Sequence, residues 1–165
     1  MRGTVQLPLK PYLHKFLCKK LNCQNNEIDL SFSDPIAFGL VVSQYMNRKR
    51  SYNVFRKEEN IDKFIETKCT STITLNLKNY HYHDTGFNIS SDAVFYINKY
   101  LDRMFRNEVF IFINAQTLYY PHIVITYAMD DFFSVYSITE NDLSKQTFCK
   151  IYQRYKREYS YLKLI

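Results

Sequence analysis

The clearest pattern of hydrophobic and polar positions lies in the last quarter of the chain, where the two kinds of residue separate at helical spacing. One face is apolar and mostly aromatic, and it consists of Phe148, Ile151, Tyr152, Tyr155, Tyr159 and Leu162. The opposite face is polar and basic, and it consists of Gln146, Lys150, Gln153, Arg154 and Arg157. This pattern predicts a helix that buries its aromatic face and exposes its basic one.

Residues suited to a helix start come just before this segment. Thr139 is followed three residues later by Asp142, which is a variant of the capping box, and Ser144 offers a second N-cap. We therefore expect the final helix to begin near residue 140 or 144 and to run to about Tyr159.

Other helices are expected where an apolar stripe follows a helix-start signal. These segments are residues 12–21 after Pro11, residues 36–46 after Ser33-Asp34-Pro35, the segment that follows residues 88–92, and residues 123–133 after Pro121. Residues 107–117 are very apolar and fit either a second helix or a buried strand, and we favour the helix. The chain is therefore expected to be mainly helical.

Strands are expected at residues 4–9, 28–32 and 70–77, where β-branched or alternating apolar residues occur. Residues 79–83 either extend the third strand or pair back on it. Residues 51–68 leave two alternatives open, a short helix around 58–66 or a mobile connection. The expected fold class is α+β, mainly helical with a small antiparallel sheet, in a single domain over residues 1–165.

Composition and charge narrow the class of protein. The chain is 46% hydrophobic and 17% aromatic, which indicates a folded globule. Its net charge of +6 is unevenly spread, because residues 1–50 and 145–163 each sum to +5 whereas residues 51–144 sum to −4. Two basic ends around an acidic middle are typical of a surface that meets a polyanion. The same charge would also serve solubility alone.

Metal and cofactor sites are not expected. The four cysteines form no C-x-x-C pair, and they are Cys18, Cys23, Cys69 and Cys149. His81 and His83 would share one face of a strand next to Asp84, but a zinc site needs further ligands that the sequence does not supply. We therefore expect free thiols, no metal and no cofactor.

Catalytic signatures are not found either. Cys149 has no accompanying base in a recognisable motif. The acidic pairs Glu58/Glu59 and Asp130/Asp131 are adjacent in sequence, so that on a helix their side chains point apart. With only three glycines, a glycine-rich phosphate loop is also excluded. The sequence predicts a protein that is not an enzyme.

The order of the last two expected helices is that of a helix-turn-helix. Residues 123–133 would brace the final helix, whose exposed face would enter the major groove of DNA. The expected connection, residues 134–139, is longer than the usual turn. The alternative is a C-terminal helix that packs by its tyrosines and exposes a solvated basic face.

The segment from Ile138 to Arg157 reads I-x-E-x-D-L-S-x-x-T-F-x-K-x-Y-x-R-Y-x-R. This pattern, together with the basic N-terminal helix after Pro11, resembles small proteins of bacteriophages and mobile elements that end in a helix-turn-helix-like unit. The resemblance implies a DNA-associated role and carries no catalytic residues. It is consistent with a C-terminal DNA-binding subdomain over residues 121–160.

The sequence thus predicts non-enzymatic DNA binding, with a role in regulating transcription or replication. The groove residues are expected to be Gln146, Lys150, Gln153, Arg154 and Arg157, since Arg and Gln read base edges. The backbone residues are expected to be Lys15, Lys19, Arg48, Lys49 and Arg50.

Two other classes of function stay open. The first is a phage structural or host-interaction protein. It would use an aromatic-rich surface to contact a protein partner or to form a homo-oligomer. An inhibitor of a host enzyme is the third possibility. No segment is apolar and long enough to cross a membrane, so we expect no membrane partner and a place in the cytoplasm of a bacterial host cell.

Overall fold

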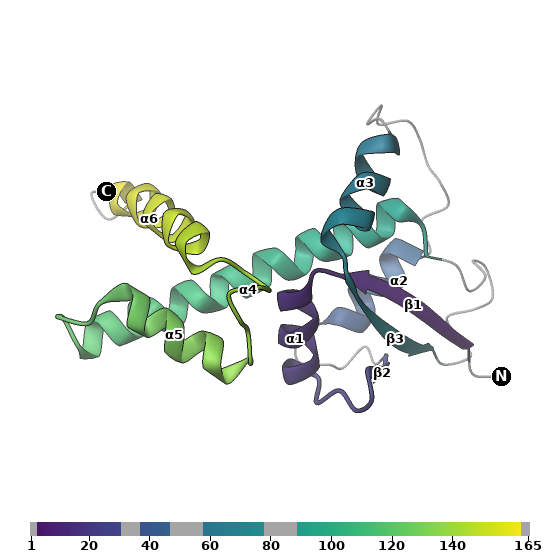
Figure 1. Ribbon diagram of the computed structural model, residues 1–165, viewed down its shortest axis with the longest axis horizontal. Coiled ribbons are helices and arrows are strands. Elements are labelled where there is room, and N and C mark those ends of the chain that lie inside the picture. Colours follow the sequence, from purple (N-terminus) through teal and green to yellow (C-terminus); the bar gives the residue numbers. More distant parts are fainter. Residues whose placement is uncertain (1–2, 31–36, 47–57, 78–88, 163–165) are drawn as a thin grey trace. The chain divides into compact units, whose positions relative to one another are not determined.

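The computed structural model describes residues 3–30, 37–46, 58–77 and 89–162, and it shows an α+β protein that is mainly helical (Figure 1). The order of the elements in this part of the chain is β1 (Gly3–Leu9), α1 (Pro11–Lys20), β2 (Glu27–Asp29), α2 (Phe38–Met46), α3 (Glu58–Lys68), β3 (Ser71–Leu77), α4 (Ser91–Tyr119), α5 (Ile125–Val135) and α6 (Lys145–Leu162). The chain divides into two compact units, unit 1 (Met1–Arg103) and unit 2 (Met104–Ile165).

Unit 1 contains a three-stranded sheet in the order β1-β3-β2. β1 and β3 are antiparallel, with Gly3 opposite Leu77 and Leu9 opposite Ser71. β2 runs parallel to β3, so the expectation of a wholly antiparallel sheet is wrong for this pair and the sheet is mixed. The long connection through α2 and α3 explains the difference, because parallel neighbours need a crossover and cannot be joined by a tight turn.

The core of unit 1 follows the period-two pattern of the strands. Val5, Leu7 and Leu9 of β1 are buried, as are Ile73 and Leu75 of β3. Residues 28–32 were expected to form one strand; the strand ends at Asp29, and the last two of these positions lie outside the described residues.

Helices α1 and α4 complete this core. Leu13, Phe16 and Leu17 of α1 are fully buried. The same is true of Ile97 and Leu101 of α4. Pro11 is the first residue of α1, as the sequence predicts, because proline gives up no helical hydrogen bond there.

Asn98 of α4 connects three segments of unit 1. It is completely buried, its Nδ2 donates to the carbonyl oxygens of Pro8 and Val94 at 2.9 Å each, and its Oδ1 accepts from the amide of Lys10 at 3.1 Å. The side chain therefore satisfies the amide of Lys10, the N-cap residue of α1, and links the end of β1 to α4.

Helix α4 is longer than expected. Residues 107–117 are helical, as favoured, but they continue the preceding helix and do not form a second one. No glycine or proline lies within α4, and the buried positions Leu101, Phe105, Val109 and Ile113 keep a spacing of four residues. The helix ends at Tyr119, shortly before Pro121, which cannot continue it.

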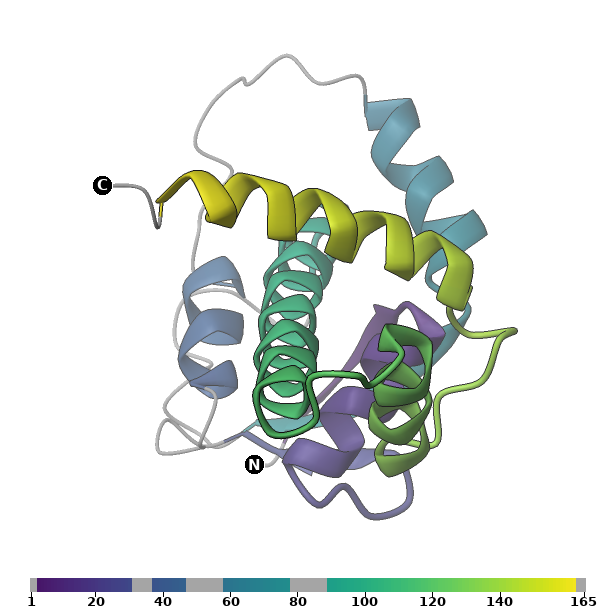
Figure 2. The same cartoon turned by 90° about the vertical axis from the view of Figure 1, so that its left-hand side faces the viewer.

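Unit 2 consists of the C-terminal half of α4 with α5 and α6. The aromatic side chains at its centre are mostly buried, and they are Phe105, Phe110, Phe132, Phe133, Phe148 and Tyr152. Rings from all three helices meet here. Phe105 of α4 contacts Phe133 of α5 at 6.4 Å and Phe148 of α6 at 5.8 Å between ring centroids. Figure 2 shows α6 lying across α4 within this unit.

Two tyrosine hydroxyls in this core have polar partners. Tyr152 of α6 donates to Oδ1 of Asn114 at 2.8 Å, and Tyr136 donates to the carboxylate of Glu108. Burial, together with the bond to Glu108, raises the pKa of Tyr136. Each ring can be buried without leaving its hydroxyl unsatisfied.

Candidate nucleic-acid interface

Helix α6 presents the candidate groove residues as one continuous surface. All five are exposed, and they are Gln146, Lys150, Gln153, Arg154 and Arg157. At about 100° per residue they fall within an arc of roughly 100°, and at about 1.5 Å per residue they extend over roughly 16 Å of the helix. We call these five residues the basic face of α6. The structure thus brings them together as the sequence predicts.

The opposite side of α6 holds the helix on unit 2. Phe148 and Tyr152 are only 1% exposed, and Tyr155 is half-buried and stacks on Phe110 of α4 with the ring centroids 4.1 Å apart. Ile151 is half-buried as well. The side chains of Tyr159 and Leu162, also expected on this stripe, lie outside the described side chains.

The charge of α6 is of one sign over residues 145–157. This stretch contains five basic residues and no acidic one, and Lys156 is exposed beside the basic face. Arg157 donates through Nε to the carbonyl oxygen of Gln153 at 3.4 Å, which holds its side chain along the helix. The positive charge is therefore concentrated on the side that faces away from the core.

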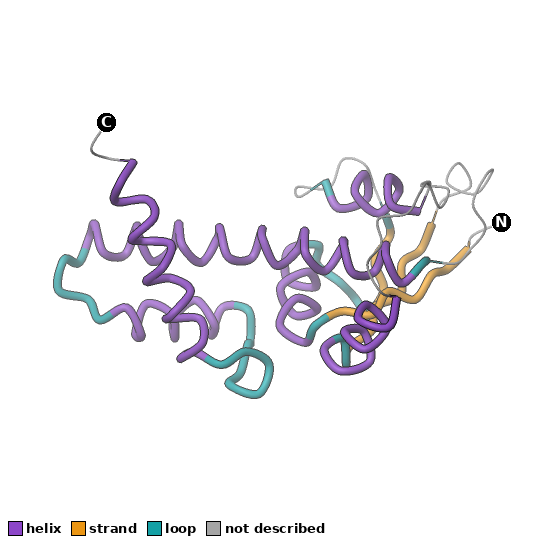
Figure 3. Tube along the Cα trace, turned by 90° about the horizontal axis from the view of Figure 1, so that it is seen from above, coloured by secondary structure: helices purple, strands orange, loops and turns teal. Residues whose placement is uncertain are grey.

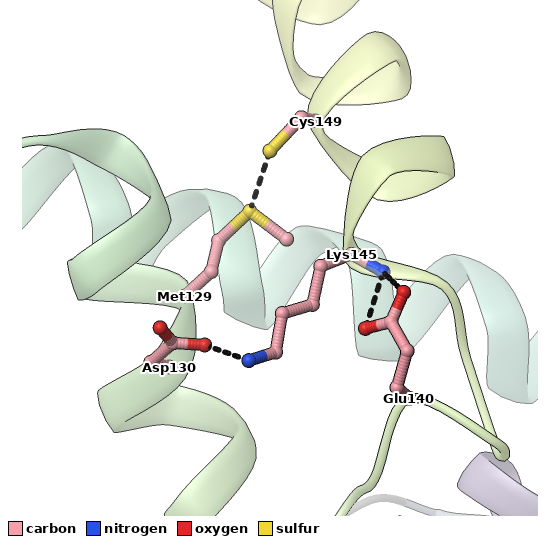
Figure 4. A network of polar contacts seen from close by, with 5 residues as sticks. All are labelled: Met129, Asp130, Glu140, Lys145 and Cys149. Carbon is pink, nitrogen blue, oxygen red and sulfur yellow. Dashed lines mark hydrogen bonds and ion pairs between the residues drawn. The ribbon is translucent and has the colours of Figure 1, made fainter.

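The first turn of α6 is fixed by carboxylates (Figure 4). Both carboxylate oxygens of Glu140 accept from the amide of Lys145 at 3.2 Å. Lys145 also forms an ion pair with Asp130 of α5, and the hydrogen bond to Asp130 raises the pKa of the Lys145 ammonium. Negative groups at a helix N-terminus satisfy free amides and complement the helix dipole.

The two expected capping signals are both used. The carboxylate of Asp142 accepts from the amide and from the hydroxyl of Thr139, each at 2.7 Å. Ser144 accepts through Oγ from the amide of Thr147 at 3.4 Å, as an N-cap residue does. Ser144 rather than Thr139 therefore marks the start of α6, and the box at Thr139 orders the connection that precedes it.

These contacts separate the charges at the two ends of the site. Three carboxylates, those of Asp130, Glu140 and Asp142, lie around the first turn of α6 or in the connection before it. The cations of the basic face begin one turn later, at Lys150. A polyanion would therefore meet attraction along α6 from Lys150 onward and repulsion near its start.

The connection between α5 and α6 is longer than predicted. The sequence places it at residues 134–139, whereas α5 ends at Val135 and α6 begins at Lys145, which leaves nine residues, 136–144. Tyr136 and Ile138 of this connection are buried in unit 2. The helix–connection–helix order of a helix-turn-helix is present, but its short turn of three or four residues is not. The helix-turn-helix assignment therefore stays a prediction.

The N-terminal cations lie on a different element. Lys15 is half-buried and Lys19 is exposed, and both belong to α1 in unit 1. Arg48, Lys49 and Arg50 lie outside the described residues. The described candidates therefore lie on two separate helices, five of them on α6 and two on α1.

Cys149 and Cys18 lie in settings that raise the pKa of their thiols. Cys149 donates through Sγ to Sδ of Met129 at 3.3 Å (Figure 4), and burial raises its thiol pKa. Burial, a hydrogen bond to Cys23 and the charge of Cys23 raise the pKa of Cys18 to about 12. A catalytic cysteine acts as a thiolate, so neither thiol has the setting of a nucleophile.

One polar pair was missed by the sequence reasoning. Nε2 of His14 lies 3.7 Å from Sγ of Cys18, one helical turn further along α1. The four-residue spacing of the two side chains is the signal that could have found it. Burial lowers the pKa of His14, which a bond to Asn26 partly offsets and the charge of Lys15 reinforces, so the ring favours its neutral form.

Metal ligation and membrane crossing can be examined for the described part of the chain. There, no group of three or more His, Cys, Asp or Glu side chains could hold a metal ion. The candidate pair His81 and His83, with Asp84, lies outside these residues. No helix among the described residues combines the length and the apolar character that a membrane span requires.

Comparisons with known proteins add no relative to this picture. No protein-family model matches the chain, and neither curated proteins nor solved structures give a match. The resemblance to small phage and mobile-element proteins is thus an expectation from the sequence alone.

Proposed function

We propose that this protein binds DNA without catalysing a reaction, and that the basic face of α6 makes the contact. The observation that carries the proposal is the segregation of charge on this helix. Lys150, Arg154 and Arg157 are exposed along one side, while the aromatic side packs into the core of unit 2. A rigid helix with exposed Arg, Lys and Gln side chains is suited to phosphates and base edges.

The part of α6 from Lys150 onward is the part that would approach DNA. Many helix-turn-helix proteins read bases with the first residues of their recognition helix. Here Gln146 lies next to the carboxylates that fix the first turn, which would repel phosphates. Contacts are therefore expected from Lys150 onward, with Gln153 and Arg154 directed at base edges or sugar-phosphate groups. Lys15, Lys19 and the cations at 48–50 would add backbone contacts.

The setting of this activity belongs to the same proposal. A role in regulating transcription or replication, in a phage or mobile element within a bacterial cytoplasm, is supported by the sequence resemblance alone.

The salt dependence of binding tests the proposal. Each neutralised phosphate contributes a slope of about −0.9 to the plot of log affinity against log salt for duplex DNA. Three cations on α6 thus contribute about −2.7, so affinity from this helix alone falls about 40-fold between roughly 50 and 200 mM salt. Replacing Arg154 and Arg157 by Ala should weaken binding and reduce the slope by about 1.8. Fluorescence anisotropy on mixed-sequence duplex DNA measures both quantities.

A matched control removes the same charge elsewhere. Lys63 and Arg103 are exposed in unit 1, and the Lys63→Ala/Arg103→Ala variant should keep the slope of the parent protein. Circular dichroism establishes that both double variants are folded. A folded Arg154→Ala/Arg157→Ala protein with unchanged affinity and slope would refute the assignment of the basic face.

A further inference from the structure

The turn between α4 and α5 exposes an unusual amount of apolar side chain. Leu118 and Tyr119 are each 82% exposed, Tyr120 is 64% and Tyr127 is 65%. Val124, at 53%, completes a group that we call the apolar tip. Backbone bonds from Tyr120 to Gln116 and from Ile123 to Tyr120 hold this turn in a compact form. Figure 3 shows it as the loop that joins the antiparallel helices α4 and α5.

The tip lies in the longest uncharged stretch of this part of the chain. No Asp, Glu, Lys or Arg occurs from Val109 to Met129, although the whole chain carries a net charge of +6. Ile111, seven residues before Leu118 and thus on the same side of α4, is also 68% exposed. An uncharged apolar surface is costly to leave in water, and on a monomer such patches rarely exceed a few hundred Å².

The size of this surface fits a protein interface. A tyrosine side chain covers about 200 Å², so the exposed fractions of the three tip tyrosines amount to roughly 400 Å². Leu118, Val124 and Ile111 add exposed aliphatic area to that of the tyrosines. A stable interface takes about 800 Å² from each partner, so the tip and Ile111 provide an area of that order.

We propose that the apolar tip is the contact surface of a homodimer, in which the tip of one chain covers the tip of a second copy. A two-fold dimer needs a single patch that is complementary to itself, and a patch of apolar and tyrosine side chains meets that need. Two chains of charge +6 repel each other wherever basic residues meet. The uncharged tip is a surface on which two copies can approach without that cost.

Such a dimer carries two basic faces, because each copy keeps its own α6. The dimer nevertheless stands apart from DNA binding, since the tip and the basic face share no residue. The two proposals can therefore fail separately.

Sedimentation of the intact protein without DNA, from micromolar to near-millimolar concentration, tests the dimer. The parent protein should reach twice the monomer mass. A Leu118→Glu/Tyr127→Glu variant should raise the dimer dissociation constant at least tenfold, because it places carboxylates in the contact. The matched control, Leu40→Glu/Val135→Glu, changes two other exposed apolar residues by the same charge and should dimerise like the parent.

A second variant avoids any dependence on added charge. Tyr119→Ser/Tyr120→Ser removes aromatic area from positions so exposed that folding should not change, and it should also weaken the dimer. A parent protein that stays monomeric throughout, or tip variants that dimerise as it does, would overturn the proposal. A monomer that instead co-sediments with phosphatidylcholine–phosphatidylserine vesicles, and loses this with the tip variants, would assign the tip to a lipid surface and overturn it too.

Discussion

Replacing Tyr155 by Ala should loosen α6 from unit 2. The ring of Tyr155 stacks on Phe110 with centroids 4.1 Å apart and planes 27° apart, and it lies 6.4 Å from the ring of Tyr152. Removing a fully buried aromatic ring costs about 3–5 kcal/mol. Tyr155 is only half-buried, so about half of that is expected, and the cost of about 2 kcal/mol includes the lost stacking.

Urea denaturation followed by far-ultraviolet circular dichroism measures this cost. With a slope of about 2 kcal/mol per molar urea, a loss of about 2 kcal/mol lowers the midpoint by roughly 1 M. Hydrogen exchange then localises the effect. Relative to the parent protein, the variant should show a larger increase of amide exchange in α6 than in β1 and β3.

Two neighbours on α6 set the scale for this measurement. Arg154→Ala alters an exposed side chain one residue away and should change the free energy of unfolding by less than about 0.5 kcal/mol. Tyr152→Ala removes a ring that is 1% exposed, and it should cost about 3–5 kcal/mol. If Tyr155→Ala behaved like Arg154→Ala, the stacking of Tyr155 on Phe110 would not anchor the helix; if Tyr152→Ala did so as well, the assignment of the aromatic side of α6 to the core would be refuted.

Three further outcomes are expected in unit 1. Asn98→Leu should lower the free energy of unfolding by about 2–5 kcal/mol in urea denaturation, since it removes the hydrogen bonds of this side chain to the part-buried amide of Lys10 and carbonyl of Pro8. Because burial lowers the pKa of His14 below 6.5, the unfolded chain takes up this proton first; stability should fall as the pH drops from 6.5 toward the lowered value, and His14→Gln should remove that part of the pH dependence. Native Cys18, with its pKa near 12, should react with iodoacetamide at pH 8 on the order of 10²-fold more slowly than an ordinary thiol, as followed by mass spectrometry.

Helices with a start signal and a steady apolar stripe could be predicted from the sequence. α1 begins at Pro11. The short helix around 58–66, one of the two alternatives for residues 51–68, is present as α3, Glu58–Lys68. The full length of α4 is harder to predict, because the dense apolar run at residues 107–117 also fits a separate element, although the four-residue spacing of the buried positions never changes. The parallel pairing of β2 could not be predicted, since three residues carry no information about which strand they join.

The candidate site was predicted only in part. The two faces of α6 follow from spacing along a single helix, which is local information, and the burial of Phe148 and Tyr152 confirms the apolar one. Two of the carboxylates near its first turn, Glu140 and Asp142, belong to the connection before the helix, whereas Asp130 is brought there from α5 by tertiary packing. The exposure of Tyr119 could not be predicted from the sequence either, because an apolar residue near a helix end is usually buried.

The 29-residue helix α4 begins in unit 1 and ends in unit 2. A cut between Arg103 and Met104 would create two new helix ends. The last carbonyl groups of the first fragment and the first amide groups of the second would lose their helical hydrogen-bond partners. Neither unit therefore contains the whole of α4. Each unit expressed alone is therefore expected to fray at its cut end of α4.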